Sequence, residues 1–398
     1  MALVDEIANL MEKARSTNAS LDDTTRISAL EAAQALVQAF ISPREAVIYD
    51  VSYRPLVPMC IRMGVQLGVF QTICSSPDGG ATTKDIADKS GASLDVVDQI
   101  MRLLAATGYV VEAGRQLFKP SPLTMTMADP AMEATTRICA ETNNASTRCA
   151  PEYFRRNGNQ FPPSFEDTPF QLGANTKLSF FDWLRENPSL AKDFQQFMAF
   201  RQAMSPNWVD WFDVEGAILD GYGKGQPDDT LIVDIGGGEG QQLRPFNRKF
   251  PPSAIPGRRI VQDRPNVIAN IIQPASETGI EPMAYDFFTP QPVKGARVYY
   301  MHWIIHDWPD EQARAILTNI AEAMEPGYSR LIINDRIVPD KGCDFMTAAV
   351  GVVMMIQCAA VERTERQWRD LLSSISGFKD FEFHHPPAGT EGIIVVTT

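Results

Sequence analysis

The chain has 398 residues, of which 44% are hydrophobic and 21% charged; this is the balance of a soluble globular protein with about two or three domains. The formal net charge of −13 at pH 7 excludes a general electrostatic affinity for nucleic acid. The six cysteines form no CxxC pair and have no metal-ligand spacing, so we expect reduced thiols, no metal and a cytoplasmic protein. The N-terminus lacks the apolar run of a signal peptide, and no membrane association is expected.

Residues 1–125 are expected to form a helical domain. Apolar residues at helical spacing predict helices over 28–40 and 57–73. A third helix is expected to begin after Thr82 and to end at Gly91. A fourth helix, from Ser93, is expected to bury an apolar face formed by Leu94, Val97, Met101 and Leu104. After it, two β-prone segments, 109–112 and 116–119, predict a hairpin.

Two helices followed by a hairpin are typical of a winged helix, which leaves DNA binding and a structural or dimerisation role as alternatives. Acidic and basic residues balance between 80 and 120, and the helix that would read DNA carries Asp95 and Asp98 against Arg102 alone. Such a helix needs basic and amide side chains. We therefore favour the dimerisation module and expect no nucleic-acid partner.

Residues 126–215 are expected to form a helical linker that contributes to a substrate pocket. The composition of 155–175 predicts an extended loop, and 180–183 and 190–204 predict helices. Large apolar side chains are candidates for lining the pocket, although such a stripe is equally typical of a core. These candidates are Phe194, Met198, Met204, Met354 and Met355.

Residues 216–398 alternate between strands and helices, which predicts an α/β, Rossmann-like doubly wound domain with a parallel sheet and helices on both faces. Ligands of such sheets bind at the carboxyl ends of the strands. The strands are expected at 231–235, 259–262, 296–301, 330–335 and 391–396, and the clearest helices at 310–324 and 365–376.

A glycine-rich turn, Gly236-Gly-Gly-Glu-Gly240, follows the first of these strands. Glycines let the backbone approach a ligand closely, so the turn indicates a nucleotide-like cofactor, against the alternative of a merely tight loop. A dinucleotide fingerprint would have glycine or alanine where Gln241 stands, and no Gly-Lys-Ser/Thr of a P-loop follows. Asp234 ends the strand before the turn, and Asp263 ends the next strand, where an acid accepts ribose hydroxyls.

A candidate catalytic group follows the strand at 296–301. His302 and His306 lie just past its end, Asp335 ends the next strand, and Glu362 precedes a helix. A histidine base needs a partner that fixes its tautomer and stabilises the imidazolium, and these acids meet that need. Glu362 could alternatively be an ordinary helix N-terminal acid.

The order and spacing of these segments resemble the class I S-adenosylmethionine-dependent O-methyltransferases of the plant caffeate/flavonoid type, in particular their fungal secondary-metabolism branch. The resemblance covers nearly the whole chain. Its most specific segments are 233–240, 261–263, 285–288, 305–310 and 362–365. It implies the Rossmann-like domain described above, an α-helical winged-helix dimerisation domain before it, and a homodimer.

The resemblance also implies roles for individual residues. S-adenosylmethionine would be the cofactor, S-adenosylhomocysteine its product, and no metal would be needed. Contacts to the cofactor would come from Asp234, Gly236, Gly238, Asp263, Asp286, Phe287, His302 and Trp308. His306 matches the general base, with Asp335 and Glu362 as its flanking acids. His302 replaces the usual Lys or Arg, and Asp335 is one methylene shorter than the glutamate of plant members, so we expect a weaker cofactor contact and a looser grip on His306.

The reaction implied is methyl transfer to a hydroxyl, expected to be phenolic, of a small aromatic, polyketide-like or alkaloid substrate. General-base assistance by His306 would contribute about 10²–10⁴-fold. Two rivals remain. One is a catalyst on the same fold that binds the cofactor without methylating, such as a dehydratase or pericyclase, in which we expect the base position to be altered. The other is a non-enzymatic winged-helix regulator, against which the set His306, Asp335 and Glu362 argues.

Overall fold

The structure is a computed structural model that describes residues 2–17, 21–77, 79–222, 228–269, 271, 275–387, 389 and 391–398. The chain divides into two compact units, Met1–Ala128 and Asp129–Thr398, and each is described by itself. Among the described helices, none is both long and apolar enough to cross a membrane.

The first unit is mainly helical and contains a three-stranded antiparallel sheet in the order β1-β3-β2. Its elements are α1 (Ala2–Thr17), α2 (Asp23–Phe40), α3 (Pro43–Ile48), η2 (Tyr49–Tyr53), α4 (Leu56–Gln66), α5 (Val69–Cys74), β1 (Ala81–Thr82), α6 (Thr83–Ser90), α7 (Leu94–Ala106), β2 (Val110–Gly114), β3 (Leu117–Pro120) and α8 (Pro122–Met127).

The helix starts and stops in this unit follow capping chemistry. Thr82 and Asp85 form a reciprocal capping box on α6, and Gly91 ends that helix in the left-handed conformation. The single helix expected over 57–73 is wrong: it is two helices, because Gly68 adopts φ +64° between them. Leu94 is also not part of the buried face of α7, since it lies in the first turn and is 51% exposed.

The second unit begins with helices that precede the large sheet: α9 (Pro130–Cys139), η3 (Ala140–Asn144), α10 (Ala145–Arg156), α11 (Pro169–Ala174), α12 (Phe180–Glu186), α13 (Pro188–Gln202), α14 (Trp208–Trp211) and η4 (Glu215–Leu219). The loop expected over 155–175 is therefore interrupted by α11. Thr168 and Gln171 cap that helix reciprocally, and Pro169 fits its first turn.

The sheet of the second unit has seven strands in the order β6-β5-β4-β7-β8-β10-β9. Its elements are β4 (Thr230–Ile235), α15 (Leu243–Lys249), β5 (Arg258–Asp263), α16 (Pro265–Ile268), α17 (Ala275–Thr278), β6 (Glu281–Ala284), β7 (Val298–His302), η5 (Ile305–Asp307), α18 (Asp310–Ala321), β8 (Arg330–Arg336), α19 (Phe345–Cys358), α20 (Glu365–Ser373), β9 (Phe381–His384) and β10 (Glu391–Thr397).

The last strand is the exception to the expected parallel sheet, because β10 pairs antiparallel with both β8 and β9. Only a short connection joins β9 to β10, and a parallel pair would need a long crossover. The strands β6, β5, β4, β7 and β8 are parallel, as expected.

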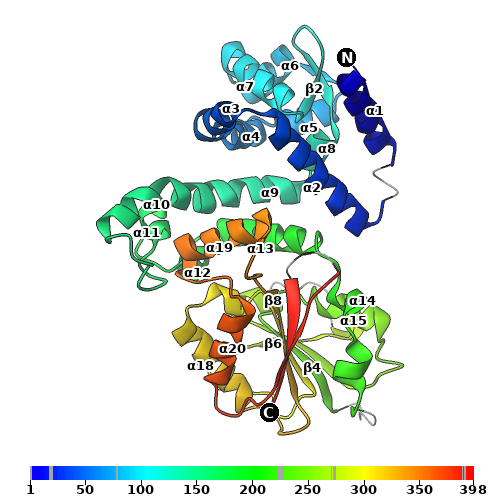
Figure 1. Ribbon diagram of the computed structural model, residues 1–398, viewed down its shortest axis with the longest axis vertical. Helices are drawn as coiled ribbons and strands as arrows, with labels where there is room; N and C mark the ends of the chain where they lie inside the picture. The colour runs from blue at the N-terminus through cyan, green and yellow to red at the C-terminus, as the bar shows by residue number, and fades with distance from the viewer. Residues whose placement is uncertain are drawn as a thin grey trace. The chain divides into compact units, whose positions relative to one another are not determined.

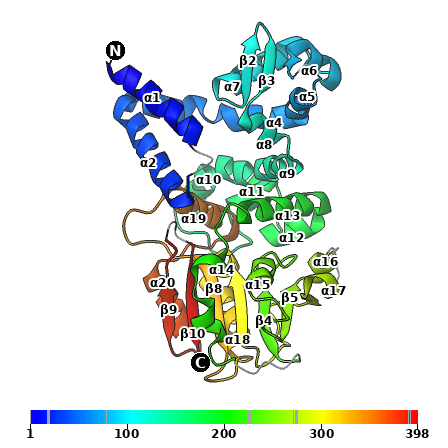
Figure 2. The same ribbon diagram turned by 90° about the vertical axis from the view of Figure 1, so that its right-hand side faces the viewer.

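Helices cover both faces of this sheet (Figures 1 and 2). On one face α18 and α20 contribute Leu317 and Trp368 to a core with Tyr299 and Leu331. On the other, α14 and α15 contribute a second core around Trp208 and Phe246, whose rings stack 5.8 Å apart. Burial on both faces explains why these strands are nearly continuous apolar runs.

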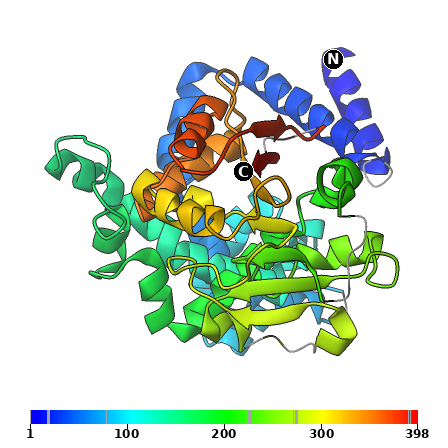
Figure 3. The ribbon, with the colours of Figure 1, turned by 90° about the horizontal axis from the view of Figure 1, so that it is seen from below.

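The carboxyl edge of the parallel strands lies toward α13 and α19, as Figure 2 shows. The last strand, β10, runs the other way, so the chain ends at the opposite edge of the sheet, which faces the viewer in Figure 3. The site described next lies at the carboxyl edge, and it is bounded by α13 and α19.

Candidate active site

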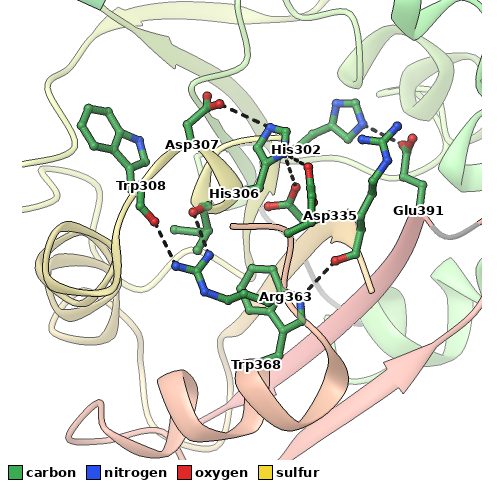
Figure 4. A network of polar contacts seen from close by, with 11 residues as sticks. His302, His306, Asp307, Trp308, Asp335, Arg363, Trp368 and Glu391 are labelled. Carbon is green, nitrogen blue, oxygen red and sulfur yellow. Dashed lines mark hydrogen bonds and ion pairs between the residues drawn. The ribbon is translucent and has the colours of Figure 1, made fainter. Parts of the chain in front are cut away.

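His306 lies in the single turn η5, directly after β7, and is 3% exposed. Its Nδ1 is 2.7 Å from Oε1 of Glu362, a hydrogen-bond distance. Asp335 Oδ1 is 3.9 Å from the same nitrogen, which makes it a charged neighbour without a hydrogen bond. On the other side of the ring, Asp307 Oδ1 is 3.6 Å from Nε2 (Figure 4).

The three acids control the charge of the ring. Burial favours the neutral imidazole, but the charges of Glu362, Asp335 and Asp307 outweigh burial and raise the pKa of His306 to about 10. Burial also raises the pKa of Asp335 to about 7 and that of Asp307 to about 6, although His306 opposes both shifts. For Glu362, burial is overcome by the ring and its hydrogen bond, so the pKa of that carboxyl is lowered. Glu362 is thus the ionised partner of His306.

Arg363 fixes the loop that carries His306. This arginine is 1% exposed, and its Nη1 and Nη2 donate to the carbonyl oxygens of Ile305 (3.1 Å) and Trp308 (2.9 Å). Nη2 also lies 2.8 Å from Oδ1 of Asp310, at the start of α18. Since Glu362 and Arg363 are consecutive, one short segment holds both the ring of His306 and the backbone around it (Figure 4).

The glycine turn after β4 presents bare backbone, as expected. Gly236 and Gly238 have φ of +72° and +58°, and a Cβ on Gly236 would collide with the side chain of Ile304. Asp263, at the end of β5, accepts a 2.9 Å hydrogen bond from the backbone N–H of Gly238. A carboxylate has about four lone-pair sites, so Asp263 retains acceptors for a ligand.

Asp234 lies directly under this turn. It is fully buried, and neither of its carboxylate oxygens has a hydrogen-bond partner among the described residues. Burial, with Asp263 nearby, raises the pKa of Asp234 to about 8. A buried acceptor without a partner requires an explanation, and a bound ligand with donor groups, or an ordered water beside it, supplies one.

Phe287 and Trp308 lie in one aromatic cluster with three other rings. Trp308 stacks on Phe181 at 5.8 Å and meets Phe165, Phe287 and Phe288 edge-on. The Asp286 side chain accepts from the backbone N–H of Phe288 and is otherwise exposed. Beside this cluster lies a shallow depression that is lined by Phe165, Phe181, Trp308 and Asp307 among others.

His302 ends β7 and is anchored on both ring nitrogens. Nε2 lies 2.8 Å from Oε1 of Glu391, and Nδ1 is within 3.0 Å and 3.2 Å of the side-chain amides of Gln242 and Gln202. The ring also stacks on Trp303. A histidine held by side chains on every side has little freedom to replace the longer Lys or Arg as a cofactor contact.

The five residues expected to line the substrate pocket do not all lie together in the structure. Phe194 and Met354 pack in a cluster with Phe170 and Phe180, and Met198 and Met355 are half-buried on α13 and α19. Met204 lies beyond the end of α13 and is 67% exposed.

Three residues of the site were not expected from the sequence: Asp307, Arg363 and Glu391. Asp307 and Arg363 directly follow His306 and Glu362 in the chain, but nothing in the neighbouring residues predicts the contacts that they make. Glu391 reaches the carboxyl edge only because β10 is antiparallel, which pairs it with Arg336 at the end of β8. Within the described ranges, no group of three or more His, Cys, Asp or Glu is arranged to hold a metal ion.

Comparison with protein families matches residues 227–379 to the O-methyltransferase domain and residues 51–128 to the O-methyltransferase dimerisation domain. Methyltransferase cfoC of Aspergillus candidus is 32% identical over 400 residues, covering 100% of this chain and 97% of that protein. O-methyltransferase asqD of Emericella nidulans is 34% identical over 343 residues, covering 86% of each chain.

Solved structures with the same fold include LepI in complex with SAM, with a TM-score of 0.87, 27% identity and 99% coverage of each chain. OxaC in complex with sinefungin and meleagrin has a TM-score of 0.84 and 26% identity, covering 99% of this chain and 97% of that one. The chain therefore belongs to the S-adenosylmethionine-dependent O-methyltransferase family, among relatives from fungal secondary metabolism, with S-adenosylmethionine as its cofactor.

Proposed function

We propose that the protein transfers a methyl group from S-adenosylmethionine to a phenolic hydroxyl of a small secondary metabolite, with His306 as general base. The observation that carries this proposal is the 2.7 Å contact between Nδ1 of His306 and Glu362. A proton on Nδ1 that is donated to Glu362 leaves Nε2 as the acceptor for the proton of the substrate.

Glu362 and Asp335 then have different roles. Glu362 holds the tautomer and orientation of the ring, because among the described residues it alone is within hydrogen-bond distance of Nδ1. Asp335, at 3.9 Å, acts on His306 through charge.

The proton balance favours a phenolic acceptor. A free phenol has a pKa of about 10, and the pKa of His306 is raised to about 10. Proton transfer from such a phenol to the ring is close to thermoneutral, but the ring accepts the proton only when it is neutral, which a pKa of about 10 places above neutral pH. When bound, S-adenosylmethionine supplies an electrophilic methyl and a positive sulfonium charge, which favours the neutral ring and an ionised acceptor.

The cofactor fits the turn after β4. We assign its binding to the bare backbone at Gly236 and Gly238, to Asp263 for ribose hydroxyls and to the unpartnered Asp234 beneath them. Phe287 and Trp308 would border the adenine and the methyl end, with Asp286 near the adenine. We leave His302 out of this assignment, because its ring is already held by Glu391, Gln242 and Gln202.

We further propose that the chain acts as a homodimer with three sections: 1–125 for dimerisation, 126–215 for the substrate pocket and 216–398 for the cofactor and catalysis. Support for the dimer comes from the match to a dimerisation domain and from large apolar side chains exposed on α1 to α4. These include Leu10, Met11, Val37, Phe40, Val47, Tyr53 and Met59. Phe194, Met198, Met354 and Met355 are proposed to line or support the pocket.

The experiment is an assay with methyl-labelled S-adenosylmethionine and a panel of phenolic acceptors, each product being examined by mass spectrometry. We expect a labelled methyl ether, larger than the acceptor by one CH₂ unit. An acceptor that is consumed while the label remains on the cofactor overturns the assignment.

The alternative is a catalyst that binds S-adenosylmethionine but rearranges its substrate. One observation favours it: a structure described as a pericyclic reaction enzyme has a TM-score of 0.87 to this chain over 99% of both. Against it stands the intact pair of His306 and Glu362, since a rearrangement needs no base to accept a phenolic proton. In the same assay, an isomer of unchanged mass that forms only with the cofactor bound would support this alternative.

A further inference from the structure

Two arginines and a tryptophan beside His306 have no role in the mechanism above. Arg336 follows Asp335 at the end of β8, Trp303 precedes η5, and Arg201 lies near the end of α13. The guanidinium carbons of Arg201 and Arg336 lie 4.7 Å and 5.7 Å from the centre of the Trp303 ring. The two guanidinium groups therefore pack against one indole ring.

Two of these side chains are buried, and Arg201 is half-buried. Arg336 is 7% exposed and Trp303 5%, and neither Nη1 of Arg336 nor Nε1 of Trp303 has a hydrogen-bond partner in the described part of the chain. No described carboxylate forms an ion pair with Arg201 or Arg336. A buried charge normally has a partner, because removing it from water without one is strongly unfavourable.

The surrounding acids do not serve as partners for these donors. Glu391, Glu362 and Asp307 act on Arg201 only through longer-range charge, and burial lowers the pKa of that arginine more than any one of them raises it. Glu391 is engaged by His302, and Glu362 by His306. The donors of Arg336 and Trp303 remain open beside them.

We propose that Arg201, Arg336 and Trp303 form a subsite for a delocalised oxyanion on the acceptor, next to the hydroxyl that reacts at His306. A carboxylate or the enolate of a 1,3-dicarbonyl group has this chemistry: oxygens that accept from a guanidinium fork and from an indole N–H. The inference rests on the proposed function and deepens it, because it assigns the protein to acidic phenols or enols. The cationic sulfonium of the bound cofactor would add to the attraction.

The test uses binding, so it does not depend on methyl transfer. The full chain, saturated with S-adenosylhomocysteine, is titrated calorimetrically with salicylate and with salicylamide, which have similar shapes and differ in charge. We expect salicylate to bind about tenfold or more tightly than salicylamide, as expected for charge-assisted hydrogen bonds. A second pair, the acidic 2-acetylcyclohexane-1,3-dione and the neutral 2-acetylcyclohexanone, distinguishes the enolate from the carboxylate as the preferred group.

Three variants locate the preference. Arg336→Gln and Arg201→Gln should each reduce the preference for the anion about tenfold, and Trp303→Phe, which keeps a ring but removes Nε1–H, should reduce it by a smaller factor. Arg369→Gln is the control, because that arginine lies on the surface in an exposed pair with Glu365. The affinity for S-adenosylhomocysteine reports whether each variant is folded.

Equal binding of anion and neutral analogue in both pairs, no binding of either anion at millimolar concentration, or an undiminished preference in Arg336→Gln would each overturn the subsite. If Arg336→Gln no longer binds S-adenosylhomocysteine, Arg336→Lys is used in its place. Lysine lacks the bidentate fork of arginine, so the preference for the anion should still weaken. If the preference is present but no phenol is methylated, the proposed function fails and the subsite stands.

Discussion

The carboxylate of Glu362 and the ring of His306 are joined by a 2.7 Å contact inside the protein, with side-chain exposures of only 2% and 4%. Two further acids, Asp335 and Asp307, lie within 4 Å of the same ring without forming a comparable contact. The orientation of the His306 ring therefore depends on Glu362, whereas its charge depends on all three acids.

Glu362→Gln is expected to move the pH dependence of the reaction. Its amide oxygen can still accept from Nδ1, but one negative charge is lost, so the pKa of His306 falls. A general base works when unprotonated, so the ascending limb of the kcat profile should shift to lower pH, with a maximum reduced by about tenfold or more. Single-turnover rates between pH 6 and 10 measure this.

Glu365→Gln is the matched control, because Glu365 lies one turn away in a surface pair with Arg369. Its profile should coincide with that of the wild type. If the ascending limb of the pH profile has the same midpoint in Glu362→Gln as in the wild type, the titration of His306 does not determine that limb.

Asp234→Asn is expected to stabilise the ligand-free protein as the pH rises. The pKa of Asp234 is raised from 3.8 to about 8 by burial, so the folded state holds a proton that the unfolded state releases in this window. The wild type therefore loses stability between about pH 4 and pH 8, by roughly 1.4 kcal/mol per pKa unit at most, and asparagine does not.

The measurement is the melting temperature of both proteins from pH 5 to pH 8.5. The difference in favour of Asp234→Asn should grow with pH, while its affinity for S-adenosylhomocysteine should fall. A pH-independent difference would mean that Asp234 is ionised throughout or paired with a group not described above.

Arg363→Met is expected to lower kcat more than it raises KM. The variant keeps apolar volume but leaves the carbonyls of Ile305 and Trp308 without their donor, so the loop that carries His306 is no longer held. Each lost buried hydrogen bond costs about 1–3 kcal/mol. A purely structural role would instead lower the melting temperature and leave kcat of the folded fraction unchanged; Arg369→Met controls for loss of an arginine.

Asp263→Ala is expected to abolish detectable binding of S-adenosylhomocysteine, because it removes the acceptor for ribose hydroxyls and the contact to Gly238. Calorimetry measures this directly. Asp286→Ala, which removes an exposed carboxylate, should have a smaller effect. Normal binding by Asp263→Ala would place the cofactor elsewhere.

The sequence predicted the α/β domain, the turn after β4 and the set around His306, because each depends on local patterns: apolar runs, glycines with positive φ, and polar residues at strand ends. It did not predict the reversed direction of β10, which depends on pairing between segments distant in the chain. Consequently Glu391, which β10 brings to His302 across 2.8 Å, was not foreseen. Arg363 was missed for a similar reason: nothing in its neighbours shows that its side chain would satisfy the carbonyls of a loop more than fifty residues earlier.

The most direct test of the central claim is the single-turnover rate of His306→Ala, measured with a phenol that the wild type methylates, beside the affinity of the variant for S-adenosylhomocysteine. If His306 is the general base, the rate should fall about 10²-fold or more, while the cofactor affinity stays within about twofold of the wild type. A variant that binds the cofactor normally and methylates within a few-fold of the wild-type rate would contradict it.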